Sequence, residues 1–600
     1  MSQEFSDPPH DKPAPGTDPS VHQSPSVPQE EPPTEELDRV EVPQGESPEG
    51  APHGPLDQTS LSFGAEETKT EEVPPVGVRL EVDAENIGWI VFDDPNDKVN
   101  RLGTSVMERL RALIDEALRR NVQGLVFVSD KENMFIAGAD IEEIAHVETP
   151  QEGTEKAAWG QAVFEAISRF PRPTVAVLNG PCVGGGYELV LACRTILAEN
   201  NPKTRIGLPE VKLGILPGFG GTQRLPKRVG IRTALDLILS GKTLPVKPAL
   251  KRGMIDAVVP EGRGREIAKE VITKRRRIKK RPLSRIDKTL ATVGPLRNFV
   301  LGKARDALAK KADRSHYPSP YMALEAIAAS YSLPETEAYS KEARLLGEAI
   351  VTPTSKSLTW LFRVSSESKK PVGLGLDLAR PVHRMAVVGA GIMGGGVAWL
   401  AGEKGFPIRI KDIRLEALEG ALATAGKLWA GAVKRRRLTP AERDRRLEKL
   451  SYTLDYRGFR HIDFVEEAVI EDLDIKHQVI SEIEREVPPE TVIASNTSSL
   501  KIEDIAAGAR RPERITGLHF FNPVDRMPLV EVIAGPQSSE SAVATTYKLA
   551  LKLGKTPILV GDCPGFLVNR LLAFYLGESL HLHEEGVPIS RIDKLFKQFG

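Results

Sequence analysis

A glycine-rich segment in the second half of the chain constrains the fold more than any other feature of the sequence. "MAVVGAGIMGG", residues 385–395, is an apolar run that predicts a strand and continues into Gly389, Gly391 and Gly394. The residues that follow are apolar and small, which is typical of a helix packed against a sheet. The next predicted strand ends at Asp412, 18 residues beyond the last of these glycines. This strand–turn–helix–strand order predicts a parallel α/β sheet.

The spacing of the glycines also indicates a binding site. Small residues let the backbone approach a pyrophosphate, and the unpaired N–H groups at the start of a helix bind it. A carboxylate at the end of the second strand binds the ribose hydroxyls, and Asp412 would repel a 2′-phosphate, which favours NAD over NADP. Basic residues around Asp412 weaken that preference. Against the alternative of an ordinary strand–turn–helix, we predict a Rossmann-type NAD site formed by Gly389, Gly391, Gly394 and Asp412.

A histidine and a glutamate lie in a segment otherwise typical of buried strands. "GLHFFNPVDRMPLVEV", residues 517–532, contains His519 and Glu531. Taken alone, a histidine beside two phenylalanines is a core residue bonded to a nearby carbonyl. With a nicotinamide site in the same chain, a proton-transfer role gains weight, because oxidising an alcohol requires a base for the hydroxyl proton. We interpret His519 as that base and Glu531 as the carboxylate that orients it.

The 600 residues exceed one hydrophobic core and predict about three or four domains. Residues 1–75 hold 15 prolines and 17 acidic residues against 3 basic ones, and too little apolar surface to offset the entropy of ordering. We therefore expect an α/β multidomain chain with a disordered N-terminal tail. The expected regions are the tail at 1–75, an α/β domain at 76–262, a helical linker at 263–380, a Rossmann-type domain at 381–561, and the start of an apolar, all-α C-terminal domain at 562–600, which we expect to be truncated.

Composition excludes several classes of protein. Because the tail holds most of the acidic excess, the remainder is moderately basic, which suits an anionic substrate better than nucleic acid. The basic run "KRRRIKKR" at 274–281 lacks accompanying aromatics and predicts a solvated helix face or linker. The three cysteines have no metal-ligand spacing, no apolar run reaches the ~18 residues of a membrane span, and no leader is evident. We expect a cytoplasmic protein without a metal, a nucleic-acid partner or a transmembrane segment.

Four further stretches accompany the dinucleotide motif. "SNTSSL", "GLHFFNP", "LVEV" and "GFLVNRLL" resemble, in order and separation, the signature of the 3-hydroxyacyl-CoA dehydrogenase family. The resemblance implies His519 as the base, Glu531 as its orienting carboxylate, and Ser498, Asn522 and Asn569 as polar groups around the substrate carbonyl and hydroxyl. Each of these last three, taken alone, predicts turn or cap chemistry.

The first α/β region contains three blocks similar to those of the crotonase family: "MFIAGADIEEI", "NGPCVGGGYELVLAC" and "GLPEVKLGILPGFGGTQRLP". The resemblance implies a crotonase-type ββα spiral and an oxyanion hole formed by the backbone N–H groups of Ala139 and Gly185. Two such donors stabilise the enolate that forms when water adds to a conjugated thioester. Glu188 and Glu210 are implied as the carboxylates that hold this water. Two additional residues in "AENNPKTRIG" lengthen a loop relative to the common spacing.

Together the two halves resemble the multifunctional family that includes the α subunits of fatty acid oxidation complexes. The resemblance implies hydration of a 2-trans-enoyl-CoA to the 3-hydroxyacyl-CoA, followed by NAD-dependent oxidation to the 3-ketoacyl-CoA. It also implies acyl-CoA substrates, an oligomer, and a thiolase β subunit as a candidate partner. Two alternatives stay open: a first half that is chiefly a Δ3-Δ2-enoyl-CoA isomerase, and a non-enzymatic scaffold or RNA-associated protein. The sequence does not predict the acyl chain length.

Overall fold

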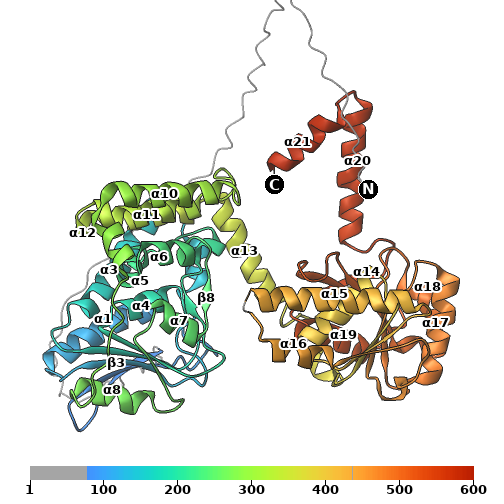
Figure 1. The fold of residues 1–600 in the computed structure, drawn as a ribbon, viewed down its shortest axis with the longest axis horizontal. Coiled ribbons are helices and arrows are strands. Elements are labelled where there is room, and N and C mark those ends of the chain that lie inside the picture. The colour runs from blue at the N-terminus through green and yellow to red at the C-terminus, as the bar shows by residue number, and fades with distance from the viewer. Residues whose placement is uncertain (1–76, 436, 600) are drawn as a thin grey trace, which may run out of the picture. The chain divides into compact units, whose positions relative to one another are not determined.

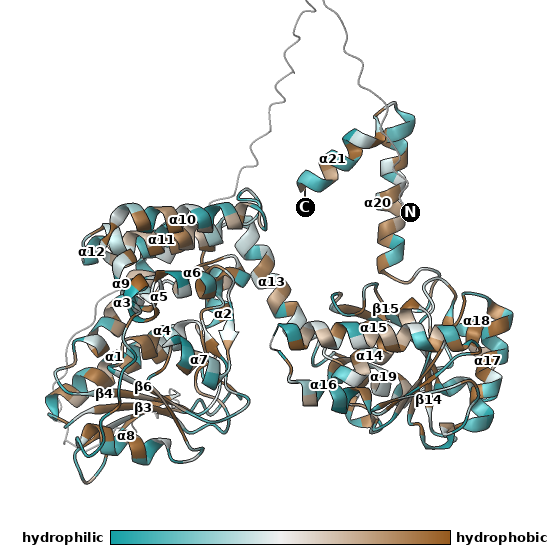
Figure 2. Ribbon diagram, in the orientation of Figure 1, coloured by the Kyte–Doolittle hydropathy of each residue, from teal (hydrophilic) through white to brown (hydrophobic). Residues whose placement is uncertain are grey.

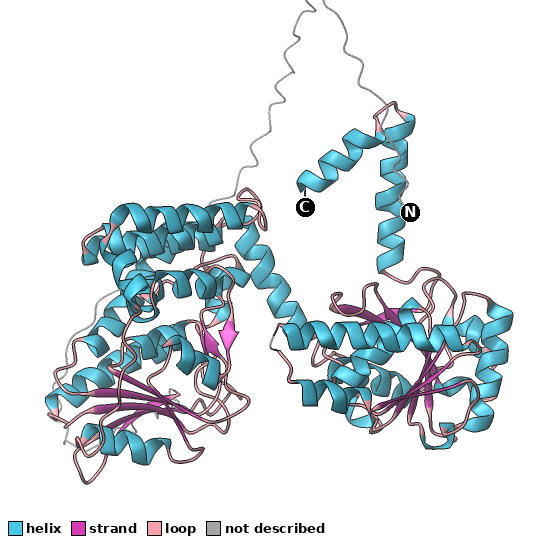
Figure 3. Ribbon diagram, in the orientation of Figure 1, coloured by secondary structure: helices cyan, strands magenta, loops and turns pink. Residues whose placement is uncertain are grey.

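The structure is a computed structural model that describes residues 77–435 and 437–599 (Figure 1). The tail expected at 1–75 lies outside the described residues. Each α/β region is a sheet covered by helices on both faces, and the strands are largely hydrophobic (Figures 2 and 3). Among the described residues, no helix combines the length and apolar character needed to cross a membrane.

The first α/β region is built on a six-stranded sheet. The strand order is β1-β2-β3-β4-β6-β9; only β1 and β2 pair antiparallel, and the other neighbours are parallel. Successive strand residues face opposite sides, so Phe127 packs under the helices of one face while Val126 and Val128 pack against the other. The strands are β1 (Val78–Val82), β2 (Gly88–Phe92), β3 (Leu125–Ser129), β4 (Thr174–Leu178), β6 (Thr195–Glu199) and β9 (Ala257–Val259).

Helices cover both faces of this sheet, and a small second sheet, β5-β7-β8, lies beside it. On one face α8 (Gly264–Ile272) packs through Ile267 and Ile272. The opposite, larger core carries the other helices of this region, several of which line the first site. These are α1 (Thr104–Arg119), α2 (Ile141–His146), α3 (Pro150–Ser168), α4 (Gly185–Leu191), α5 (Gly221–Val229), α6 (Ile231–Ile238) and α7 (Val246–Arg252); the small strands are β5 (Cys182–Val183), β7 (Ile206–Gly207) and β8 (Thr243–Leu244).

The segment at 263–380, which we predict as a helical linker, contributes part of its helices to the first core. Ala326 and Ile327 of α11, with Leu345 and Ile350 of α12, belong to the same hydrophobic cluster as the first sheet. α3 and α12 cross closely, since a Cβ on Gly347 would lie 2.2 Å from the carbonyl oxygen of Pro150. The helices are α9 (Arg285–Thr292), α10 (Gly294–Ala309), α11 (Ser319–Ser332), α12 (Glu335–Ile350) and α13 (Pro353–Glu367).

The second α/β region is an eight-stranded sheet in the order β12-β11-β10-β13-β14-β15-β16-β17. All neighbours are parallel except β15 and β16, and the order reverses at β10, where such folds bind ligands. The strands are β10 (Met385–Val388), β11 (Ile408–Lys411), β12 (Leu450–Thr453), β13 (Phe464–Glu467), β14 (Val492–Ser495), β15 (Ile515–Phe520), β16 (Leu529–Ala534) and β17 (Thr556–Gly561). The helices are α14 (Ile392–Glu403), α15 (Leu415–Lys434), α16 (Pro440–Leu447), α17 (Leu473–Glu486), α18 (Ile502–Ala506) and α19 (Glu540–Lys552).

The segment expected to begin an all-α domain forms α20 (Val568–Glu584) and α21 (Ile589–Phe599). Several large apolar side chains of α20, including Leu571 and Phe574, are exposed.

Candidate active sites

The first site begins at a turn that requires small residues. Gly184, just before α4, has a positive φ of 57°, and a Cβ on Gly186 would lie 2.7 Å from Ile136 Cγ2 and 2.9 Å from its carbonyl oxygen. Ala139 N lies 3.6 Å from the place that a Cβ on Gly185 would occupy, so the two predicted oxyanion donors are neighbours. Gly185 is the first residue of α4, and its N–H is not used within the helix.

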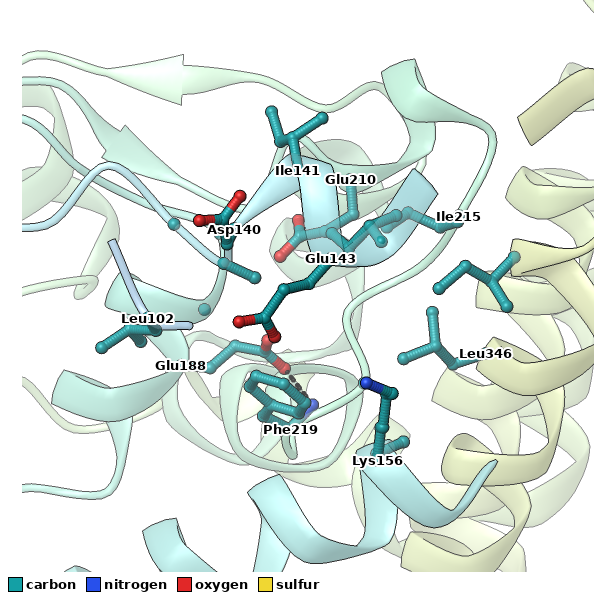
Figure 4. A pocket seen from close by; sticks show the side chains of 18 of the residues that line it. Leu102, Asp140, Ile141, Glu143, Lys156, Glu188, Glu210, Ile215, Phe219 and Leu346 are labelled. Carbon is teal, nitrogen blue, oxygen red and sulfur yellow. Dashed lines mark hydrogen bonds between the residues drawn. The ribbon is translucent and has the colours of Figure 1, made fainter. Parts of the chain in front are cut away.

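Two buried carboxylates lie beside this turn. Glu188 in α4 is 2% exposed, and its Oε1 accepts hydrogen bonds from Phe219 N at 2.8 Å and Gly221 N at 2.7 Å. Glu210, which begins a 3₁₀ turn (Glu210–Leu213), is buried, and neither of its carboxylate oxygens has a partner among the described residues. Figure 4 shows both carboxylates directed into one pocket. One carboxylate is therefore fixed, and the other has oxygens available for a ligand or water.

The electrostatics favour one shared proton. Burial raises the pKa of Glu188 well above its ordinary value, and repulsion from Glu210 and Glu342 adds to this effect, while the backbone donors oppose it. Burial also raises the pKa of Glu210 to about 8. Two neighbouring buried carboxyl groups with raised pKa values are suited to exchange a proton with a water held between them.

The pocket around these carboxylates is largely apolar. It encloses about 1040 Å³ of empty space, including its open mouth. Glu143 also points inward, fixed by bonds from Thr104 N at 2.8 Å and Thr104 Oγ1 at 2.7 Å (Figure 4). The apolar lining includes Leu102, Met107, Ile144, Val147, Leu346 and Ile350. Such a lining suits an acyl chain whose reacting carbons lie near the carboxylates.

The predicted dinucleotide motif forms the turn between β10 and α14. Gly389 has a φ of +101°, and a Cβ on Gly394 would lie 1.8 Å from Gly389 O, so neither position admits a side chain. Nothing lies within 4 Å of the place where a Cβ on Gly391 would be, which leaves space over the start of α14. Asp412 accepts a hydrogen bond from Ala390 N at 2.7 Å, which holds the carboxylate at this turn. The open turn, the helix start and the carboxylate fit a bound NAD.

His519 and Glu531 face each other across the antiparallel pair β15–β16. They are directly opposed in the register, and His519 Nδ1 lies 2.7 Å from Glu531 Oε2. Glu531 Oε1 accepts bonds from Leu567 N at 3.0 Å and Val568 N at 2.9 Å. Burial alone would raise the pKa of Glu531, but the bonds from His519 and from these backbone donors lower it below its ordinary value. Glu531 is therefore an ionised anchor for the imidazole.

The three other polar residues predicted at this site, Ser498, Asn522 and Asn569, make different contacts. Asn569 Nδ2 donates to Ser498 O at 3.0 Å, which joins the start of α20 to the loop after β14. Ser498 N also donates to Glu471 Oε1 at 2.8 Å. Asn522 follows β15 with an exposed side chain, and no hydrogen bond joins it to the other site residues among those described.

Sequence reasoning missed a buried ion pair next to this loop. Lys476, 1% exposed, lies 2.9 Å from Glu467 Oε1, and its Nζ lies 3.4 Å from Glu471 Oε2. Glu467 is the last residue of β13 and Glu471 follows the strand, at the edge of the sheet where the strand order reverses. Acidic residues at the carboxyl end of a predicted strand, in "FVEEAVIED", were the available signal.

Comparison with protein families agrees with both sites. A model described as "Enoyl-CoA hydratase/isomerase" matches residues 83–291, and one described as "3-hydroxyacyl-CoA dehydrogenase, NAD binding domain" matches residues 384–563. The chain is a fused enoyl-CoA hydratase and 3-hydroxyacyl-CoA dehydrogenase. The predicted family, the multidomain α/β fold, the two enzymatic activities of fatty acid β-oxidation and the use of NAD are confirmed.

Among the solved structures that are similar to part of the fused enzyme are three proteins, two of which are described as dehydrogenases. M. tuberculosis FadB2 is 37% identical over 34% of this chain and 73% of its own, with a TM-score of 0.34. The (S)-3-hydroxybutyryl-CoA dehydrogenase of Ralstonia eutropha is 36% identical over 35% of this chain and 74% of its own, with a TM-score of 0.34. The dehydrogenase part of multifunctional enzyme 1 from C. elegans is 30% identical over 37% of this chain and 51% of that one, with a TM-score of 0.31.

Proposed function

We propose that Glu188 and Glu210 carry out the hydration together. The pair holds one proton and one water; one carboxylate takes a proton from the water as its oxygen adds to C3, and the other carboxyl delivers a proton to C2. The N–H groups of Ala139 and Gly185 stabilise the negative charge that forms on the thioester oxygen. The observation that carries this assignment is the fixed Glu188 carboxylate beside a Glu210 carboxylate with no partner of its own among the described residues.

The same observation argues against an isomerase as the sole activity of the first site. Moving a double bond transfers a proton between two carbons of one substrate and needs no activated water. One carboxylate is enough for that task, whereas adding water engages a base and an acid. Both carboxylates face the pocket, as hydration requires (Figure 4).

For the oxidation, we propose that His519 takes the hydroxyl proton at Nε2, because Nδ1 faces Glu531. Glu531 stays ionised and stabilises the imidazolium that forms. Gly389, Gly391, Gly394 and Asp412 would hold NAD, which accepts the hydride when bound. Ser498 and Asn569, joined by their hydrogen bond, would position the substrate oxygens, and Asn522 would approach them from the end of β15.

We further propose a cytoplasmic enzyme that works with a thiolase and as an oligomer. The 3-ketoacyl-CoA product is the substrate for thiolytic cleavage, so a thiolase is the class of enzyme that consumes it. Cys182, Cys193 and Cys563 are all free, which suits a reducing compartment.

A single coupled assay tests the two site assignments. The enzyme is given crotonyl-CoA with and without NAD, and both the enoyl-thioester absorbance and NADH are followed. Glu188→Gln should abolish hydration and leave oxidation of 3-hydroxybutyryl-CoA intact, and His519→Ala should do the reverse. Loss of both reactions in either folded variant would contradict two separate sites.

A further inference from the structure

A third buried carboxylate lies behind the hydratase site, on a helix outside the matched hydratase region. Glu342 belongs to α12, beyond residue 291 where that match ends, and its side chain is fully buried. A glutamate in a core is rare unless its oxygens are bonded, so its surroundings indicate why it is there.

In each of its hydrogen bonds the Glu342 carboxylate is the acceptor. Its Oε1 accepts from Gly220 N at 2.6 Å and from Gln161 Nε2 at 3.0 Å. Its Oε2 accepts from Thr222 N at 2.9 Å and from the hydroxyl of Thr222. Burial raises the pKa of Glu342 above its ordinary value, and the donors from Thr222, Gln161 and Gly220 oppose that rise. The carboxylate lies at the start of α5, where N–H groups are unpaired within the helix.

The same short segment also holds Glu188. The N–H groups of Phe219 and Gly221 bond Glu188, whereas those of Gly220 and Thr222 bond Glu342. Four consecutive N–H groups therefore alternate between two buried carboxylates, and the chain is held from both sides. Gly220, with a φ of +104°, supplies the backbone turn that this alternation needs.

We propose that Glu342 is a positioning residue for the hydration reaction. It fixes residues 219–222 so that two of their N–H groups orient the Glu188 carboxylate toward the substrate pocket. The proposal rests on the assignment of Glu188 as a catalytic residue. It also makes α12 part of the hydratase site, and Leu346, one turn further along α12, lines the same pocket (Figure 4).

The expected consequence is a loss of turnover and not of substrate binding. The segment bonds the carboxylate that moves the proton, whereas the pocket lining other than Gly218 and Phe219 belongs to other segments. Misplacing a catalytic group by about an ångström reduces turnover by about 100-fold. In Glu342→Leu we therefore expect kcat for hydration of crotonyl-CoA to fall by about 10- to 100-fold, with KM nearly unchanged.

The test compares three variants of the full chain. Glu342→Leu removes both acceptor oxygens, and Glu342→Gln keeps one acceptor and the side-chain volume, so it should recover part of the lost kcat. Glu348→Gln changes an exposed glutamate on the same helix and should behave as the parent enzyme. NAD-dependent oxidation of 3-hydroxybutyryl-CoA in the same preparations should stay constant.

Several results would overturn the proposal. One is a Glu342→Leu variant with the kcat of the parent, or with a change in KM alone. Another is a Glu342→Gln variant that keeps both its thermal transition and full hydratase turnover. If Glu342→Leu does not fold, the Gln variant alone decides the question by the same criterion. Glu188→Gln distinguishes this failure from that of the underlying assignment: a hydratase that survives Glu188→Gln refutes the catalytic role of Glu188 itself.

Discussion

Replacing Glu466 should stabilise the dehydrogenase region, and the gain should depend on pH. Glu466 lies in β13 between β10 and β14, fully buried, and neither of its carboxylate oxygens has a hydrogen-bond partner among the described residues. Burial raises the pKa of this carboxyl well above its ordinary value; repulsion from Glu467 adds to the effect, and attraction to Lys476 opposes it. The folded protein therefore keeps a proton that the unfolded chain releases.

The sign and size of the effect follow from that difference. An unfolded glutamate has a pKa of about 4.3, and each pH unit above it at which the folded carboxyl stays protonated costs about 1.4 kcal/mol. Stability is therefore lost as pH rises above that value, by about 4 kcal/mol at pH 7 for a carboxyl still protonated there. Glu466→Leu removes this cost, offset by about 1 kcal/mol of imperfect packing. The net gain is about 3 kcal/mol at pH 7 and close to zero near pH 5.

Differential scanning calorimetry at pH 5, 6 and 7 measures this gain. For a region of this size, about 3 kcal/mol corresponds to a rise in Tm of about 6–12 °C. Glu466→Gln is the matched control, because it removes the ionisation but leaves an unpaired amide, so its pH dependence should vanish without the full gain. A Leu variant with the same stability as the parent at pH 7, or with an equal gain at pH 5, would refute the reasoning.

The remaining predictions concern the ion pair, the imidazole and the tail. Lys476→Met should cost about 3–5 kcal/mol in denaturant unfolding, because Glu467 would stay buried without its partner, whereas the exposed Lys552→Met should change little. Glu531→Gln should slow oxidation and move the acidic limb of its pH–rate profile to lower pH, since the imidazolium loses its counter-charge; an unmoved limb would contradict this role. Deleting residues 1–75 should leave both activities within about a few-fold of the parent in the coupled assay, because so few apolar residues cannot build a site.

Local sequence patterns predicted the helices and strands better than they predicted which residues far apart in the sequence make contact. The glycines at 389–394 and the strand ending at Asp412 were predictable, because the turn, the helix and the strand are contiguous in the sequence. His519 and Glu531 are only 12 residues apart, and the antiparallel register of β15 and β16 brings them face to face. Their pairing could therefore be inferred from one short stretch, because oxidising an alcohol requires a base for the hydroxyl proton.

The role of α12 shows why the remainder was not predicted. Its helical character is evident from the sequence, but its partner segment lies 120 residues earlier, at Thr222. A glutamate on a helix is usually exposed, so composition suggests a surface residue at position 342. The available signal was the spacing of Ala338, Glu342 and Leu345, which puts the carboxylate on the buried stripe of the helix.

Both sites use the same means of fixing a carboxylate. Glu188 is bonded by the N–H groups of Phe219 and Gly221, and Glu531 by those of Leu567 and Val568. Because the donors are backbone groups, only a substitution by proline deletes one of them, and no residue type in the sequence marks them. Their positions depend on what anchors each segment: Glu342 for the first, and the start of α20 for the second. Substitutions at those anchors should therefore change the chemistry of residues that they do not contact.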